Sequence, residues 1–449
     1  MNSISFDITN VLSTAVGKEG LENTMITSVS DKLQSYNMEL RDTPYPFMDL
    51  PSNKFQFSEM KKLCDTINTK KIKNIVLLGI GGSSLGTETI FNALLHPFHN
   101  LSDAIRGHKP RYFILDNIDP HKINRVIEII TPEKEDTILI AISKSGETPE
   151  TISQFMIFKE LLGNATGRIV LITDRDKGIL KEIAEREGYP VLNVPDGVGG
   201  RFSVLTPVSM FPAAFMGIDI DEIMAGAKDM AQHIKEKGPV ENIGIILSSI
   251  LYLMDKHGKN IHVMMPYCER LSGFADWFRQ LEAESIGKNM QGPTPLKSIG
   301  VTDQHSQLQL YIDGPKDKFI TLIYSADDDR LISNAFPYIE SIDYLAGKNL
   351  RDLFYAEFLG TTLSITESKT PNITILIDKI NGYNLGALFM LYEMVIAFLG
   401  YLYEVNPFDQ PGVELGKTYT KAIMGKKGLE DKHETIKTKL STSKTIIRF

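Results

Sequence analysis

Cysteine and tryptophan are scarce in this sequence: its 449 residues include two cysteines, Cys64 and Cys268, and one tryptophan. Two cysteines cannot build a disulfide framework or a cysteine zinc site, so we expect a reducing compartment. The first residues lack both the basic start and the apolar core of an export signal, which makes the cytoplasm the expected location. Acidic residues outnumber basic ones, 56 to 48. This balance argues against nucleic acid or an anionic membrane as a partner.

Long apolar runs are also rare. The segment from Leu385 to Val405 is long enough to span a bilayer, but Glu393 lies near its middle and no basic anchors flank it. Because a lone carboxylate is costly in lipid, we predict a buried core helix here and no membrane span.

Several short apolar segments predict strands that alternate with helical or turn segments. In the first half these are 73–79, 112–116, 137–143 and 168–174, and in the second half 261–265, 318–324 and 372–377. This alternation is typical of doubly wound α/β domains with mainly parallel sheets. The sequence therefore predicts an α/β fold whose ligand crevices lie at the carboxyl ends of the strands.

One loop at such a strand end is rich in hydroxyl groups. Ser143, Lys144 and Ser145 follow an apolar strand, and Pro149 marks the start of a helix with Thr148 as its N-cap. Free N–H groups at a helix start, hydroxyl donors and one ammonium suit a dianion such as a phosphate ester. An ordinary capped turn with a solvated lysine is the alternative.

A glycine turn follows the first strand, in the order Gly79-Ile-Gly-Gly82-Ser83-Ser84. The turn lacks the third glycine of a dinucleotide fingerprint and the Gly-Lys-Ser/Thr ending of a nucleotide P-loop. We therefore expect no nucleotide cofactor. The turn does offer hydroxyls and close backbone approach at a second helix start.

Two further segments carry charged candidates. The glycine-rich run ending in Gly200-Arg201 brings a guanidinium to a tight backbone, which suits an oxyanion, although a turn with a surface arginine is the alternative. In the predicted helix 271–287, helical spacing places Glu284 on the apolar stripe of Trp277 and Glu282 on the wet face. Glu284 is then either paired with Lys288 or held with a raised pKa for proton transfer.

The remaining candidates are weaker. His305 lies in a polar turn, where a surface role is the common one. Gln410 and Lys417 are seven residues apart and would share one face of a helix. Asp327, Asp328 and Asp329 indicate a solvated turn more than a metal site, and no metal is expected. The basic segment beyond residue 417 is expected to form a helix and a loosely held end.

Taken in order, these motifs resemble those of the glucose-6-phosphate isomerase family, of the shorter bacterial kind with two sugar-isomerase (SIS) domains. The resemblance rests on Gly199-Gly200-Arg201-Phe202-Ser203, on Phe408-Asp409-Gln410 through Lys417, and on the Glu284-Ser285 to Gly287-Lys288 element. It covers almost the whole chain past residue 70.

The resemblance implies conversion between glucose 6-phosphate and fructose 6-phosphate through a cis-enediol, a step of glycolysis and gluconeogenesis, without metal or cofactor. It implies a homodimer in which His305 crosses the interface. Glu284 would move the proton, Arg201 would stabilise the oxyanion, and His305 and Lys417 would assist ring opening. The residues implied for substrate binding are Gly82, Ser83, Ser143, Lys144, Ser145, Thr148, Gly200, Gln280 and Gln410.

The resemblance also implies the domain organisation: residues 1–58 as an N-terminal helical segment packing on the second domain, 59–205 as the first SIS domain, 206–417 as the second, and 418–449 as a C-terminal helix and tail. Two alternatives stay open. One is a non-catalytic sugar-phosphate sensor on the same fold, and the other is an isomerase that also accepts mannose 6-phosphate.

Overall fold

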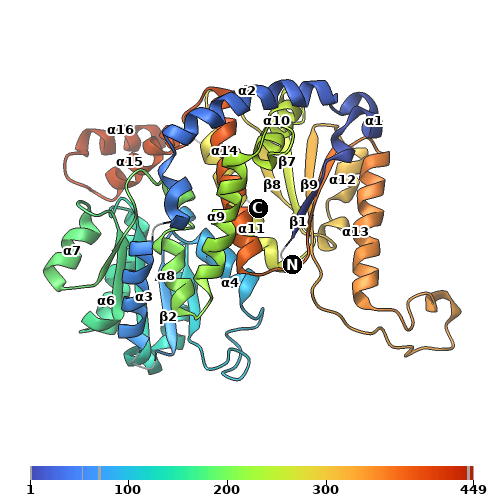
Figure 1. Ribbon diagram of the computed structural model, residues 1–449. Coiled ribbons are helices and arrows are strands. Elements are labelled where there is room, and N and C mark those ends of the chain that lie inside the picture. The colour runs from blue at the N-terminus through green and yellow to red at the C-terminus, as the bar shows by residue number, and fades with distance from the viewer. Residues whose placement is uncertain (1–2, 53, 69–71, 442–444, 448–449) are drawn as a thin grey trace.

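The computed structural model describes residues 3–52, 54–68, 72–441 and 445–447, which form two α/β units lying side by side (Figure 1). Each unit is built on a five-stranded sheet with helices on its faces. The predicted fold class, two doubly wound α/β units with mainly parallel sheets, is confirmed.

The first sheet is entirely parallel and has the order β3-β2-β4-β5-β6. Every residue of β2, β4 and β5 is buried, as the continuous apolar runs predict for strands covered on both faces. The strands are β2 (Asn74–Leu78), β3 (Arg111–Leu115), β4 (Thr137–Ser143), β5 (Ile169–Thr173) and β6 (Val191–Asn193). The helices of this unit are α3 (Lys54–Asn68), α4 (Leu85–Leu94), α5 (Pro120–Ile130), α6 (Pro149–Leu162), α7 (Ile179–Glu187) and α8 (Pro207–Phe215).

The second sheet has the order β1-β10-β9-β7-β8 and is parallel except at β1. The strands are β1 (Ile4–Asp7), β7 (Ile261–Pro266), β8 (Thr294–Lys297), β9 (Lys318–Tyr324) and β10 (Asn372–Ile377). The sequence predicts only helical and loop-like structure for residues 1–58, and here the prediction is wrong, because β1 pairs antiparallel with β10 and closes the sheet.

The helices of the second unit include a short α12 (Leu308–Asp313), which follows the turn of His305. The others are α1 (Ser13–Val16), α2 (Asn23–Asp42), α9 (Ile220–Glu236), α10 (Ile243–Lys256), α11 (Ser272–Ile286), α13 (Leu350–Glu367) and α14 (Gly382–Tyr403). The chain ends with α15 (Glu414–Ile423) and α16 (Glu430–Ser441), which Figure 1 shows on the side of the molecule where α6 and α7 lie. The last two pack against each other and account for most of the basic C-terminal segment.

Helix α14 is the core of the second unit. It is long and apolar enough to cross a membrane, but 94% of its apolar window is buried inside the protein, where it packs against α9, α10 and α11. The prediction of a buried core helix is confirmed. Glu393 on α14 is fully buried, and this burial raises the pKa of its carboxyl well above the usual range.

Both sheets have a topological switch point. In the first, β2 and β4 are neighbours, but the chain leaves β2 toward β3 and leaves β4 toward β5 on the other side. The turns after β2 and β4 therefore diverge and leave a crevice between them, where doubly wound folds bind ligands. The glycine turn and the hydroxyl-rich loop are these two turns.

Candidate active site

The hydroxyl-rich loop has the geometry of an anion cradle. Ser143 ends β4 and is buried, and its Oγ lies 2.8 Å from Thr148 Oγ1 at the start of α6. Gly146 has a φ of 65°, a left-handed conformation that suits glycine, and its N–H donates to the Ser143 carbonyl at 3.0 Å. The tight turn directs the exposed Ser145 and the half-buried Lys144 away from the strand.

Lys144 has no carboxylate in ion-pair contact within the described part of the chain. Burial lowers the pKa of its ammonium group, against the opposing effect of Asp174 and Asp196. A partly desolvated ammonium without an ion pair, on a loop that also carries hydroxyls, favours an anionic ligand, because such a ligand supplies a counter-charge in direct contact.

The glycine turn, η4 (Gly81–Ser83), contacts the turn that carries Arg201 and the helix α11 of the second unit. A Cβ on Gly82 would lie 2.2 Å from the carbonyl oxygen of Gly200, so two backbones meet there with no room for a side chain. Gly81 has a φ of 58°, and a Cβ on it would lie 2.6 Å from Gln280 Nε2 on α11. The half-buried Ser83 ends this turn. The turn after β2 thus sits directly against the helix that carries Glu284.

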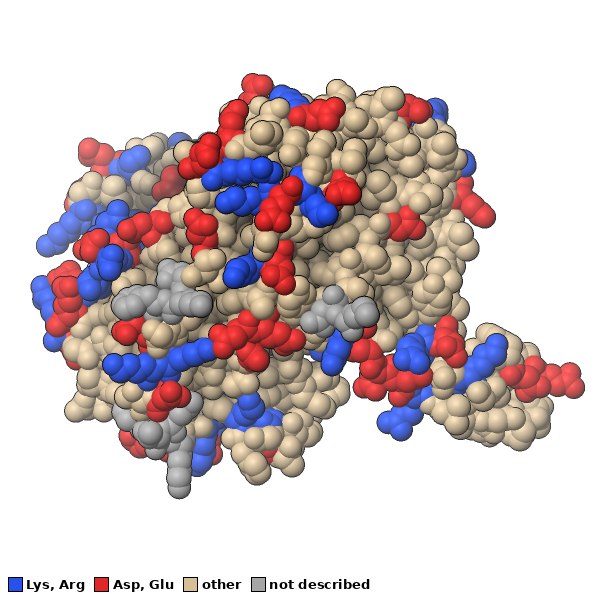
Figure 2. Space-filling view, viewed as in Figure 1, with Lys and Arg blue, Asp and Glu red and all other residues tan. Residues whose placement is uncertain are grey.

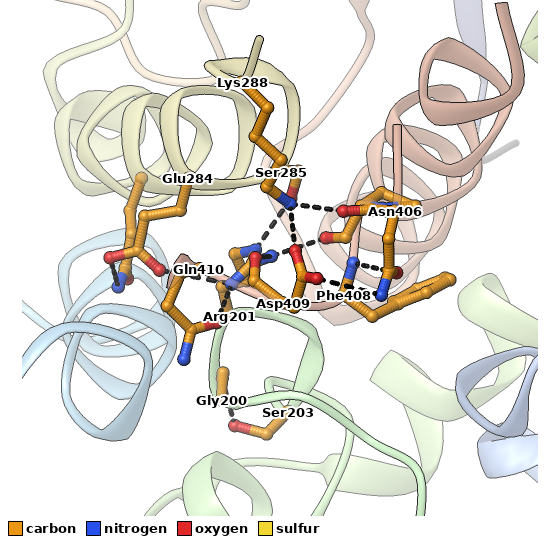
Figure 3. Close-up of polar contacts among 12 residues, drawn as sticks. Gly200, Arg201, Ser203, Glu284, Ser285, Lys288, Asn406, Phe408, Asp409 and Gln410 are labelled. Carbon is orange, nitrogen blue, oxygen red and sulfur yellow. Dashed lines mark hydrogen bonds and ion pairs between the residues drawn. The ribbon is translucent and has the colours of Figure 1, made fainter. Parts of the chain in front are cut away.

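Glu284 is held between an amide and a guanidinium (Figure 3). Gln280 Nε2 donates to Glu284 Oε1 at 3.1 Å, and Arg201 Nη1 approaches Glu284 Oε2 at 3.3 Å. The Arg201 side chain is 3% exposed and that of Glu284 35%. Arg201 is therefore a rigid part of the protein interior, while Glu284 stays open to a ligand. No described residue donates to the buried Gln280 Oε1.

Arg201 ties three segments together. Its Nε donates to Ser285 Oγ at 2.7 Å and its Nη1 to Gln410 Oε1 at 2.9 Å. Its Nη2 donates to the carbonyl oxygens of Pro407 and Asp409. Burial lowers the pKa of Arg201, opposed by Glu284 and Asp409, but an arginine stays charged because its usual pKa is so high. The fixed positive charge beside the Glu284 carboxylate is thus supported on several sides.

The predicted faces of α11 need correction. Glu282, expected on the wet face, is 0% exposed and lies 3.1 Å from His262 Nδ1 on β7. Glu284, expected on the apolar stripe, faces Arg201 and is partly open. The stripe defined from Trp277 is only one of the buried faces, because α11 is covered by α4 and α14 as well as by β7.

The predicted alternative for Glu284, an ion pair with Lys288, is also wrong. Lys288 Nζ instead lies 2.8 Å from Asp409 Oδ1 and donates to the Asn406 carbonyl (Figure 3). Sequence reasoning missed the contacts of Asp409 and Asn406, which bring the 406–410 segment against α11. No local pattern marks a backbone carbonyl as the acceptor of a distant arginine.

Two predicted residues lie outside this cluster. His305 is exposed, and its N–H bonds within its own turn to Thr302. Lys417 is exposed on α15 and pairs with Glu414 at 2.8 Å. Gln410 precedes a short 3-10 turn and is not helical, so it does not share a helix face with Lys417 as predicted. Within the described residues of one chain, neither His305 nor Lys417 contacts Glu284 or Arg201.

The two halves of the cluster meet different chemical needs. An anion cradle at one switch point has the chemistry that suits a phosphate ester. A carboxylate can move a proton between neighbouring carbons, and a fixed guanidinium beside it can stabilise an enediolate. Among the described residues, no group of three or more His, Cys, Asp or Glu is placed to hold a metal ion. The fold and the cluster together define a phosphosugar isomerase of the two-domain SIS class.

Comparison with known proteins gives the family. The family model described as "Phosphoglucose isomerase" matches residues 51–446. The chain belongs to the phosphoglucose isomerase family. It is 38% identical over 437 residues to a glucose-6-phosphate isomerase of Rubrobacter xylanophilus, covering 95% of this chain and 99% of the relative. It is 37% identical to one of Carboxydothermus hydrogenoformans, covering 97% of each chain.

Solved structures share the fold. A hypothetical protein from Thermus thermophilus superposes with a TM-score of 0.82 at 31% identity, covering 94% of this chain and all of that one. A glucose-6-phosphate isomerase from Chlamydia trachomatis gives a TM-score of 0.77 at 20% identity, covering 98% and 92%. At that identity the second likeness shows the fold alone.

Proposed function

We propose that the chain interconverts glucose 6-phosphate and fructose 6-phosphate in the cytoplasm, through a cis-enediol and without metal or cofactor. The observation that carries this proposal is that Gln280 and the backbone of Arg201 lie against the glycine turn of the first unit, while the side chains of both residues contact Glu284. It joins a base and an oxyanion partner to the crevice that contains the anion cradle. Membership of the phosphoglucose isomerase family supports the same substrate pair.

In this mechanism Ser83, Ser143, Lys144, Ser145 and Thr148 hold the 6-phosphate at the switch point. Glu284 removes the proton from C2 of the open-chain aldose and returns it to C1, while Arg201 stabilises the oxygen that gains negative charge. Gln280, whose Oε1 has no described donor, and Gln410 orient the sugar hydroxyls. His305 and Lys417 assist ring opening.

The direct test is turnover of both sugar phosphates by the purified protein. Reaction in deuterated water is expected to place deuterium at C2 of glucose 6-phosphate, because the Glu284 carboxyl carries the abstracted proton during the lifetime of the enediol and exchanges it with solvent. A protein that binds the sugar phosphates but converts neither is a sensor and not an isomerase. Conversion of mannose 6-phosphate in the same assay would widen the specificity.

The phosphate cradle predicts a separation of KM from kcat. Lys144→Met is expected to raise KM for both sugar phosphates about 10- to 100-fold with little change in kcat, because a charge-assisted contact to a non-reacting group is lost. Steady-state kinetics measure this. The control is Lys134→Met. Lys134 is exposed and precedes the amino-terminal end of β4, away from the cradle, so its replacement is expected to leave KM unchanged.

The same lysine predicts a pH dependence. An ammonium is charged below its pKa, and burial lowers the pKa of Lys144, so the cradle loses its charge at a lower pH than an ordinary lysine would. KM is expected to rise on the alkaline side below the usual lysine range. Lys144→Arg is expected to move this rise to higher pH. A KM profile that is identical in the wild type and in Lys144→Arg would assign the titration to another group.

His305 lies outside the Glu284 cluster of its own chain, and a homodimer would bring the His305 of a second copy to that cluster. Residues 330–349 form an arm that stands out from the body as a separate lobe (Figures 1 and 2), closed at its base by the pairing of Leu331 with Asn349. Its exposed apolar side chains include Leu331, Phe336, Tyr338, Ile339, Ile342 and Tyr344. Such a surface favours a partner. If the arm binds a second copy of the chain, His305 of each subunit can reach the Glu284 site of the other.

Mixed dimers test this arrangement. Subunits carrying Glu284→Gln and subunits carrying His305→Ala should each be nearly inactive alone. If each site takes Glu284 from one chain and His305 from the other, every mixed dimer contains one intact site. Refolding the two together is expected to restore about a quarter of wild-type activity, since about half the dimers are mixed and each has one site of two. No recovery would place His305 in its own chain's site.

A further inference from the structure

The second sheet repeats the topology of the first. Taken from its free edge, the order β8-β7-β9-β10 matches β3-β2-β4-β5, with the earliest strand in second place. The chain leaves β7 toward β8 and leaves β9 toward β10, so the second unit has its own switch point between β7 and β9. Doubly wound folds bind ligands at such a point. The proposed reaction uses the switch point of the first unit only.

A cavity of about 640 Å³ lies at this second switch point. Its walls come from the turn after β7, the segment after β9 and the first turns of α13. None of its lining residues contacts the substrate in the proposed mechanism. The volume is that of a site for a small organic molecule.

Ser325 marks the cavity as a binding site. It follows β9 directly, as Ser143 ends the corresponding strand β4. Its side chain is 1% exposed and lines the cavity, and among the described residues its Oγ has no hydrogen-bond partner. Ser143 Oγ, by contrast, is satisfied by Thr148. Buried hydroxyls without a partner are uncommon, and a ligand in the cavity would provide one here.

The charges of the cavity differ from those of the first crevice. Five carboxylates and three guanidinium groups line it, namely Glu269, Asp327, Asp328, Asp329 and Glu357 with Arg270, Arg330 and Arg351. Arg270 pairs with Asp327 at 3.0 Å and Arg351 with Asp329 at 3.6 Å. The remaining groups leave a surplus of two negative charges, which disfavours a phosphate ester. Val301, Leu353 and Phe354 add an apolar wall that suits a ring.

Two elements of the proposed active site border the cavity. Gln304, which precedes His305, donates from Nε2 to Glu357 Oε2 at 3.0 Å and accepts from the Tyr267 hydroxyl at 3.0 Å. Arg270 lies in the turn that leads directly into α11, the helix of Glu284. A molecule that contacts Glu357 or Arg270 can therefore shift the turn that carries His305 or the start of α11, the helix of Glu284.

We propose that this cavity is a second small-molecule site, which takes an uncharged or cationic ring compound that hydrogen-bonds to Ser325, and that its occupant modulates the isomerase through the turn of His305. The binding half stands on the cavity alone. The modulation half rests on the proposed function.

Three indole compounds of similar shape test the binding half on the full-length protein as it assembles in solution: tryptophol is neutral, tryptamine cationic and indole-3-acetate anionic. By calorimetry, tryptophol and tryptamine are expected to bind at least about tenfold more tightly than indole-3-acetate, a difference of one charge interaction in a partly buried site. Equal binding of the acetate, or no binding of any of the three, would overturn the proposed chemistry.

Variants locate the site. Leu353→Trp fills the cavity and is expected to abolish binding, whereas Leu363→Trp, the same change at an exposed position of the same helix, is the matched control. Ser325→Ala is expected to weaken the binding of tryptophol about tenfold, the effect of one lost hydrogen bond. This smaller substitution still tests the site if Leu353→Trp does not fold. Full affinity in Ser325→Ala and Leu353→Trp would place the compounds elsewhere.

Kinetics separate the two halves. Saturating tryptophol is expected to change KM or kcat of the isomerase at least about twofold in the wild type and in Leu363→Trp, and not in Leu353→Trp. Binding without any kinetic change overturns the modulation and leaves the site. Binding to a chain that converts neither sugar phosphate leaves the site and overturns the proposed function instead.

Discussion

Glu284→Gln is expected to lower kcat for both sugar phosphates about 10³-fold, within the range typical for loss of a general base. Glutamine has nearly the same shape and can still accept from Gln280 Nε2, so the local structure should persist. It cannot take the C2 proton, and the enediol does not form. Stopped assays in both directions measure the loss, and the deuterium exchange described above should fall with it.

The matched control lies two residues away on the same helix. Glu282→Gln makes the same chemical change in a fully buried residue that contacts His262 and not Arg201. We expect it to lower the melting temperature, because a buried hydrogen bond to His262 is disturbed, while kcat stays within a few-fold of the wild type. If Glu284→Gln keeps normal turnover, or if Glu282→Gln loses as much, Glu284 is not the base.

The second large effect is expected from Arg201→Lys. Arg201 donates to five acceptors on two other segments, and one ammonium with three N–H groups cannot reach them all. We expect kcat to fall about 10²- to 10³-fold, as expected for loss of a preorganised oxyanion partner, with a lower melting temperature as well. The loss should appear in kcat more than in KM, because the charge it stabilises develops during the reaction.

Arg168→Lys separates the catalytic loss from the structural one. Arg168 is also a buried arginine that donates to backbone carbonyls, those of Lys134 and Thr137, but it lies at the amino-terminal end of β5, away from the crevice. It is expected to lower stability and leave kcat near the wild-type value. Equal losses of kcat in both variants would reduce Arg201 to a structural role.

Strands buried on both faces were the most predictable elements. The apolar runs of β2, β4 and β5 carry their own signal, and proline at the first position of α6 and α8 marks where each helix starts. β1 carried no such signal, because four alternating residues acquire a strand's hydrogen bonds only from β10, near the other end of the chain. Its formation depends on a tertiary contact that local sequence does not encode.

The site was predictable in parts. The anion cradle follows from local chemistry, since strand, hydroxyls and helix start are contiguous. The Arg201 to Gln410 contact joins residues 209 positions apart. Local patterns pointed to each residue separately, and only the family resemblance assigned both to one site. The error over Glu282 has a physical cause: a single stripe count assumes one buried face, and α11 has several. For His305 and Lys417 the single chain offers no contact with the cluster among the residues described, and the roles proposed for them rest on the family resemblance.

Helix α14 has a consequence for how the protein is made. As it leaves the ribosome it is as apolar as a bilayer-spanning segment, yet it begins only at residue 382, after α9, α10 and α11 have been synthesised. The surfaces that will cover it are thus available before it emerges, and it can dock at once. The carboxyl group of Glu393 also makes insertion of α14 into a lipid bilayer unfavourable before the helix has docked. Late synthesis and one central acid together direct this hydrophobic helix into its own fold.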